Sequence, residues 1–201
     1  MSEIIVLSGS PSMVSKTAAL GEYVAHRLRG HGRLVRTIAV RELSPTALFT
    51  ADTMDPQIAE VIDAIEGADG IVVASPVYKA ACSGLLKALL DLLPQFALAG
   101  KVVLPLLTGG TKAHVLAIDY SLRPVLTSLG ADHVVQGWFV LDTDIELGAQ
   151  PVLATAARQP VDAAVDGFAD ALRRIGIDVG AGVDVGAGVG VDVDVRTGNV
   201  A

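Results

Sequence analysis

A loop rich in hydroxyl side chains follows the first apolar segment of the chain. Residues 4–7 predict a short strand, and a helical pattern begins near Thr17. Neither Gly-x-Gly-x-x-Gly nor Gly-x-x-x-x-Gly-Lys-[Ser/Thr] occurs there. Backbone N–H groups at a helix start, together with hydroxyls, can hold a phosphate, although a helix cap after an ordinary turn explains the same residues. The hydroxyl residues of this loop are Ser8, Ser10, Ser12, Ser15 and Thr17.

Two further stretches that could contact a ligand follow later predicted strands. Pro76, Val77 and Tyr78 come after residues 70–75, and Thr108, Gly109 and Gly110 come after residues 102–107. The carboxyl ends of parallel strands meet at one edge of a sheet, where ligands bind. Each stretch alone is compatible with a strand-ending turn or a flexible loop. Three such stretches at three strand ends favour one shared binding site.

Strand and helix patterns alternate along most of the chain, which predicts a doubly wound α/β domain with right-handed crossovers. Residues 44–55 are predicted as a connecting loop. The strands are predicted at residues 4–8, 34–40, 70–75, 102–107 and 134–141. The helices are predicted at residues 16–29, from Pro56 to about 65, and at 82–93, 113–129 and 152–175.

The end of the chain differs in composition from the rest. Residues 176–201 repeat Val, Asp and Gly in near copies, whereas residues 1–175 carry the strand and helix patterns. We predict one domain over 1–175 followed by a low-complexity tail, which the glycines favour as disordered. A tail that pairs as a strand is the alternative, and a calcium site is weakly indicated because the glycine-rich repeat pattern is incomplete.

Composition excludes several classes of function. A net charge of −7 and the lack of basic runs argue against nucleic acid as a partner. The single cysteine, Cys82, excludes an internal disulfide, and no apolar run is long enough to cross a membrane. The four histidines lack metal-ligand spacing, and Gly-x-Ser-x-Gly is absent. We therefore expect a cytoplasmic protein without a metal site.

Several motifs together resemble the NAD(P)H-dependent FMN reductase family, which has a flavodoxin-like fold. The resemblance extends over residues 4–174 and is closest to the branch that serves a two-component alkanesulfonate monooxygenase. It implies a five-stranded parallel sheet of order 2-1-3-4-5 with helices on both faces. Many members carry Arg where this chain has Ser12, so a phosphate contact from that Arg is not expected here. The motifs are Gly9-Ser10-Pro11, Ser15-Lys16-Thr17, Ala74-Ser75-Pro76-Val77-Tyr78, Ser83-Gly84-Leu85-Leu86-Lys87 and Gly100-Lys101-Val102.

The resemblance also implies the ligands and the residues that bind them. The ligands are FMN and NADPH, with NADH as an alternative hydride donor. Residues that hold the phosphate end of FMN would be Ser8, Ser10, Ser15 and Thr17. Residues that line the ribityl chain and the flavin ring would be Pro76, Val77, Tyr78, Lys79, Thr108, Gly109 and Gly110.

Tyr120 is the one residue to which the resemblance assigns a role in flavin transfer. In this branch a Tyr inserted at this position bulges the helix into a π-turn at a subunit interface of a homodimer or homotetramer. Such bulges tend to mark functional sites, although a Tyr that only packs in a core or interface is the alternative. The implied function is NADPH-dependent reduction of FMN for a partner monooxygenase. The alternative functions are an FMN-bound reductase of quinones, azo compounds or metal oxyanions, and a flavodoxin-like electron carrier.

Overall fold

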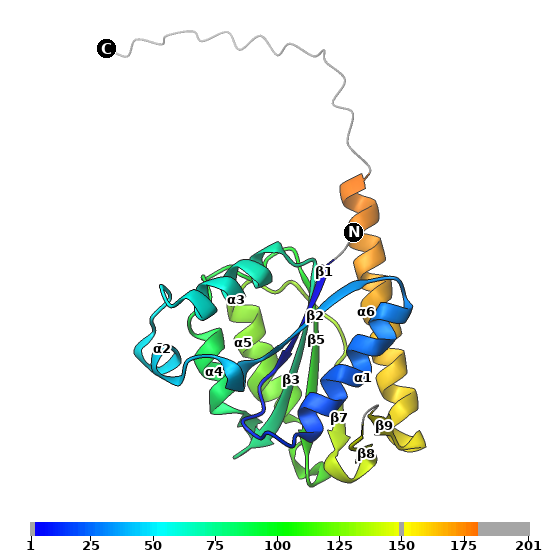
Figure 1. Ribbon diagram of the computed structural model, residues 1–201. Helices are drawn as coiled ribbons and strands as arrows, with labels where there is room; N and C mark the ends of the chain where they lie inside the picture. Colours follow the sequence, from blue (N-terminus) through cyan, green and yellow to red (C-terminus); the bar gives the residue numbers. More distant parts are fainter. Residues whose placement is uncertain (1–2, 149–150, 181–201) are drawn as a thin grey trace, which may run out of the picture.

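A parallel sheet forms the centre of the molecule (Figure 1). The computed structural model describes residues 3–148 and 151–180. The sheet order is β2-β1-β3-β5-β6, and β7 continues the edge by pairing with β5. Because β6 and β7 are two halves of the predicted fifth strand, the predicted order is confirmed. The strands are β1 (Glu3–Ser8), β2 (Leu34–Ala39), β3 (Gly70–Tyr78), β5 (Val102–Gly109), β6 (His133–Val134) and β7 (Trp138–Leu141).

Helices cover both faces of this sheet, as predicted (Figure 1). Helices α1 (Lys16–Gly30) and α6 (Thr155–Gly180) pack on one face, against Ile4 and Val6 of β1. Helices α3 (Pro56–Gly67), α4 (Gly84–Leu90) and α5 (Arg123–Ser128) pack on the other, against Ile5 and Leu7. All four of these strand residues are fully or almost fully buried, as expected for a parallel strand covered on both sides.

The predicted fifth strand is interrupted by a one-residue bulge opposite Pro105. Val103 pairs with Val134 and Leu106 with Trp138, so residues 104–105 of β5 face residues 135–137. The carbonyl of Val103 accepts from the N–H of Val135 at 2.9 Å, so the backbone groups of residue 103 point toward β6 and β7. Because every second residue of a strand points its backbone groups to the same side, those of residue 105 point there too. Pro105 has no N–H to donate there. The uninterrupted strand predicted over 134–141 is therefore wrong.

The predicted helix over residues 113–129 is also irregular. It consists of a 3₁₀ turn, η2 (Lys112–His114), a π-helix, η3 (Ile118–Leu122), and α5. The predicted helix over 82–93 is shorter, because β4 (Ala81–Cys82) turns back to pair with the end of β3. Both differences lie beside the carboxyl end of the sheet.

Three other boundaries differ from the sequence prediction. The predicted loop over 44–55 contains α2 (Pro45–Thr50), whose first turn is capped by Ser44. The last helix starts later than predicted, because β9 (Val152–Leu153) pairs with β8 (Ile145–Glu146) before α6 begins. Helix α6 then continues to Gly180, so the first five residues of the predicted tail are helical. The remainder, residues 181–201, lies outside the described residues.

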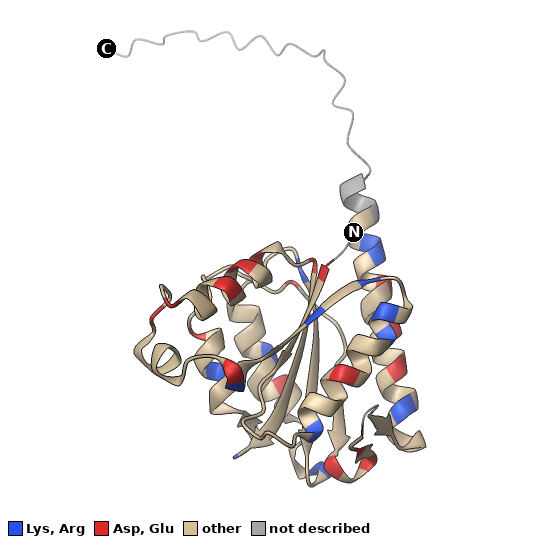
Figure 2. Cartoon of the chain, in the orientation of Figure 1, with Lys and Arg blue, Asp and Glu red and all other residues tan. Residues whose placement is uncertain are grey.

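Charged residues of both signs are interspersed along α1 and α6 (Figure 2). Asp162 of α6 accepts a hydrogen bond from the hydroxyl of Tyr23 at 2.8 Å and pairs with Arg27 at 3.2 Å. Burial and the bond to Asp162 raise the pKa of Tyr23. These contacts fasten the two helices of this face together. Within residues 3–148 and 151–180, none of the helices has the length and apolar character needed to cross a membrane.

Candidate functional site

The loop after β1 and the carboxyl ends of β3 and β5 meet around one cleft of about 300 Å³. The structure therefore brings together most of the residues that the sequence singled out. The predicted residues that line the cleft are Ser10, Ser15, Thr17, Pro76, Val77, Tyr78, Thr108, Gly109 and Gly110.

One end of the cleft is formed by the first turn of α1. The Ser15 hydroxyl caps the helix by accepting from the N–H of Ala18 at 3.0 Å. The Ser10 hydroxyl accepts from the N–H of Ser12 at 3.3 Å. In both bonds the serine oxygen is the acceptor, so each O–H proton is still available to an anion. The cap and the anion site, which the sequence left as alternatives, are thus compatible.

A buried hydroxyl pair joins this end of the cleft to the carboxyl end of β5. The Oγ1 atoms of Thr17 and Thr108 lie 2.6 Å apart, and both residues are almost fully buried. Gly109 follows Thr108, and a Cβ built there would lie 3.0 Å from the ring of Phe139. The carboxyl end of β5 is thus held close to the start of α1, with Phe139 packed behind it.

A second set of hydrogen bonds holds the loop after β1. The N–H of Gly9 donates to the carbonyl of Ala74 at 2.8 Å, and the Ser83 hydroxyl donates to the carbonyl of Gly9 at 2.5 Å. The Ser75 hydroxyl in turn accepts from the N–H of Ser83 at 2.9 Å. Ser83 also caps α4 by accepting from Leu86. One serine therefore links the loop after β1, the end of β3 and the start of α4.

Two of the predicted binding residues do not line the cleft. Ser8, the last residue of β1, is 1% exposed, and among the described residues its hydroxyl has no hydrogen-bond partner, but it does not line the cleft. Lys79 is exposed and adopts φ 51°, and Ala80 adopts φ 62°, in the tight turn that joins β3 to β4. This turn reverses the chain direction immediately after Tyr78. A binding role for Ser8 and Lys79 stays a prediction.

Two charged side chains line the cleft although the sequence analysis assigned them no role. Lys16 lies in the first turn of α1, and its ammonium group donates to the carbonyl of Ile145. Asp142 directly follows β7, and burial raises the pKa of its carboxyl group while Lys16 opposes that shift. Asp142 could have been found from the sequence, because it directly follows the fifth predicted strand, as the other cleft residues follow theirs.

Tyr120 lies in the π-helix η3, as the resemblance implied for this segment. Its side chain is 80% exposed, which excludes packing in the core of the single chain. The neighbouring Ser121 hydroxyl accepts from the N–H of Cys82 at 3.4 Å and so connects the π-helix to β4. Burial raises the pKa of the Cys82 thiol, which fits a structural cysteine. A role for Tyr120 in flavin transfer stays a prediction.

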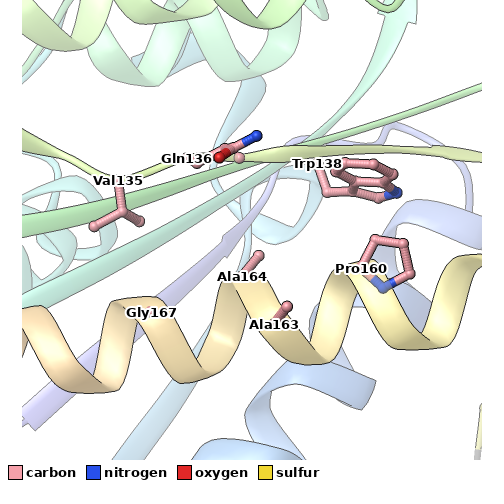
Figure 3. Close-up of a pocket in the computed structure, with 8 residues that line it drawn as sticks. Val135, Gln136, Trp138, Pro160, Ala163, Ala164 and Gly167 are labelled. Carbon is pink, nitrogen blue, oxygen red and sulfur yellow. The ribbon is translucent and has the colours of Figure 1, made fainter.

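Another hollow, of about 310 Å³, lies between the bulged edge strand and α6 (Figure 3). Trp138 lies opposite Pro160 across it, and Gln136 and Ala164 also line it. None of its lining residues also lines the cleft, and it carries no charged group. In the part of the chain that the structure describes, no cluster of His, Cys, Asp and Glu could hold a metal ion.

The comparisons with known proteins agree with this geometry. A model of the NADPH-dependent FMN reductase family matches residues 2–146, which include all the loops around the cleft. The chain belongs to the NADPH-dependent FMN reductase family. An FMN reductase (NADPH) from Escherichia coli K12 is 42% identical over 177 residues, which are 88% of this chain and 93% of the relative. An NADH-dependent FMN reductase, SfnF, from Pseudomonas fluorescens is 30% identical, with 76% and 84% covered.

A solved structure supports the same assignment. The apo form of an NADH:FMN oxidoreductase superposes with a TM-score of 0.79 at 46% sequence identity, covering 85% of this chain and 90% of that one. Members of this family are oxidoreductases that act on FMN. The cleft fits the phosphate end of FMN because Ser10 and Ser15 present hydroxyl donors beside the start of α1, where the N–H groups of a first helical turn lack intrahelical partners.

Proposed function

We propose that this chain reduces FMN with NADPH, which passes a hydride to the flavin while a proton completes FMNH₂. The observation that carries the proposal is the cleft itself. It places the hydroxyl donors of Ser10 and Ser15 at one end and the glycine-rich loop Thr108–Gly110 beside Val77 and Tyr78. A phosphate at the first end and a planar ring along the second would fit this arrangement.

The flavin and the nicotinamide supply the hydride chemistry, and the protein supplies orientation. Ser10 and Ser15 donate to the phosphate, and the Thr17–Thr108 pair keeps the two ends of the cleft at a constant separation. Gly109 and Gly110 let the backbone approach the ring closely. Tyr78 is 49% exposed at the mouth of the cleft, where it can cover the ring from water. This scheme requires no acid or base side chain.

The released FMNH₂ would serve a flavin-dependent monooxygenase of sulfonate assimilation in the cytoplasm. A hydroxyl-rich cradle, with Ser12 where many family members carry Arg, supports a flavin that is released after each turnover. We also propose a homodimer or homotetramer, because Val115, Leu116 and Tyr120 form an exposed apolar patch on and beside the π-helix. Residues 86–93 add little to such a surface, because most of their apolar side chains lie in the chain's own core.

Steady-state assays with free flavins test the proposal. We expect NADPH to be oxidised steadily with FMN as acceptor, and riboflavin to have a KM about tenfold higher, because it lacks the phosphate that the hydroxyls hold. Parallel assays with NADH measure the donor preference. Protein that purifies with tightly bound FMN and reduces quinones or azo dyes would favour the bound-flavin reductase. No oxidation of either donor with free FMN would favour an electron carrier.

Substitution of Tyr120 by alanine tests the role of the π-helix. The side chain is 80% exposed, so we expect the free energy of unfolding to change by no more than about 0.5 kcal/mol. If Tyr120 loosens flavin binding through the subunit interface, Tyr120→Ala retains more FMN on purification and turns over more slowly. Flavin absorbance per chain and FMN reductase rates measure both effects.

Phe49→Ala is the matched control, because Phe49 is an aromatic residue with 79% exposure on α2, outside the cleft. It should leave flavin retention and turnover at wild-type values. Unchanged retention and turnover in Tyr120→Ala would refute the role of Tyr120 in flavin transfer.

A further inference from the structure

The carboxyl group of Asp142 lines the cleft but has no part in the scheme above. Asp142 is half-buried at the start of the 3₁₀ turn η4 (Asp142–Asp144), directly after β7. Within the described residues its carboxylate accepts no hydrogen bond, and Lys16 is the charged group that acts on it. A partly buried carboxylate without a hydrogen bond gives the fold no stability that a neutral side chain would lack. Its place in the cleft therefore indicates a role toward the bound ligand.

Lys16 does not neutralise Asp142 by direct contact. The Lys16 ammonium donates to the carbonyl of Ile145, the residue that follows the same turn, and no ion pair joins it to Asp142 in the described part of the chain. The cleft thus holds one cation and one anion among neutral hydroxyls. A phosphate monoester carries about −1.5 to −2 charges at pH 7, so it would meet both an attraction and a repulsion there.

We propose that Asp142 weakens the hold of the cleft on the FMN phosphate by charge repulsion and thereby speeds flavin release. The inference rests on the proposed function, since it takes FMN as the ligand of this cleft. When the ligand displaces water from the cleft, the repulsion between two negative groups increases. A protein that kept its flavin permanently would gain nothing from a carboxylate here. A protein that must release its product after each turnover would gain faster release from such a carboxylate.

A different role for Asp142 makes an opposite prediction. Its carboxylate could accept a hydrogen bond from the ribityl hydroxyls of the flavin, which would strengthen binding of FMN and riboflavin alike. Repulsion acts on the phosphate alone and so affects FMN but not riboflavin. Comparing the two flavins therefore separates the two roles.

The test is Asp142→Asn, which keeps the shape of the side chain and removes its charge. Dissociation constants for FMN and riboflavin are measured by quenching of flavin fluorescence, and the FMN dissociation rate by stopped flow. At low salt we expect FMN to bind about tenfold tighter and to leave about tenfold more slowly, with riboflavin changed by less than about twofold. In 1 M NaCl the gain for FMN should shrink only in part, because salt screens partly buried charges less than exposed ones.

Asp144→Asn is the matched control, because it removes the same charge from the same turn at a residue that does not line the cleft. It should leave both affinities unchanged. An equal gain for FMN in both variants would overturn the proposal, because net charge rather than Asp142 would then be responsible. Weaker binding of both flavins to Asp142→Asn would also overturn it, in favour of the ribityl contact. Wild-type protein that binds FMN no better than riboflavin would instead refute the phosphate site of the proposed function.

Discussion

Replacing Gly137 with alanine is expected to lower the free energy of unfolding by about 3–5 kcal/mol. Gly137 is the last residue of the bulge between β6 and β7. A Cβ built on it lies 2.1 Å from the carbonyl oxygen of Pro105 and 2.7 Å from its Cγ. Neither atom can rotate away, because one belongs to the backbone of a buried strand and the other to a proline ring. The edge strand would have to separate from β5.

Separation of the edge strand from β5 would also distort the cleft. Strand β7 carries Phe139, which packs behind Gly109, and Asp142 directly follows its last residue. We therefore expect Gly137→Ala to weaken FMN binding as well as to lower stability. The midpoint of urea unfolding and a flavin titration measure the two effects.

Gly167→Ala is the matched control for this substitution. Gly167 lies inside α6, and a Cβ there meets nothing within 4 Å. Alanine should stabilise this helix by up to about 1 kcal/mol, since it has the higher helix propensity. A Gly137→Ala protein with the wild-type urea midpoint would show that the bulge opens at little cost and would contradict the expectation.

The central strands could be predicted because each is a continuous apolar run between turn signals, whereas their order was implied by the family resemblance. Residues 71–74 and 102–104 are buried on both faces, and both runs read as parallel strands in the sequence alone. The bulge could not be predicted in the same way. Its cause is a contact between Pro105 and Gly137, which are 32 residues apart along the chain, and that contact depends on the register of two strands.

In the candidate site, too, some residues could be predicted from the sequence and others depend on tertiary contacts. Ser10, Val77 and Gly109 could be placed together because each follows a predicted parallel strand, and such strands end at one edge. Asp142 occupies the equivalent position after the fifth strand, but a lone Asp after a strand is no motif. Lys79 was assigned by resemblance, whereas its positive φ belongs to a turn that no local pattern predicts. Hydroxyl pairing between Thr17 and Thr108 likewise depends on tertiary contact.

Substitution of Gly9 by alanine should distort the end of the cleft that we propose for the phosphate. A Cβ on Gly9 would lie 2.6 Å from the Cβ of Leu86, which is fully buried in α4. Because a Cβ cannot change its position by side-chain rotation, the loop after β1 must move away from α4. This movement stretches the bond from Ser83 to the Gly9 carbonyl and displaces Ser10. We expect a loss of about 1–3 kcal/mol in stability and FMN binding weakened about tenfold or more.

Gly84→Ala is the matched control, because it shows whether any added methyl group near α4 lowers stability and FMN binding. Gly84 is the first residue of that helix, and a Cβ there meets nothing within 4 Å. Its substitution should leave the urea midpoint and the FMN dissociation constant near the wild-type values. For Gly9→Ala, riboflavin affinity should fall less than FMN affinity, since the displaced Ser10 acts on the phosphate. An equal loss for both flavins would mean that the loop after β1 shapes the whole cleft, and that its hydroxyls do not form a separate phosphate site.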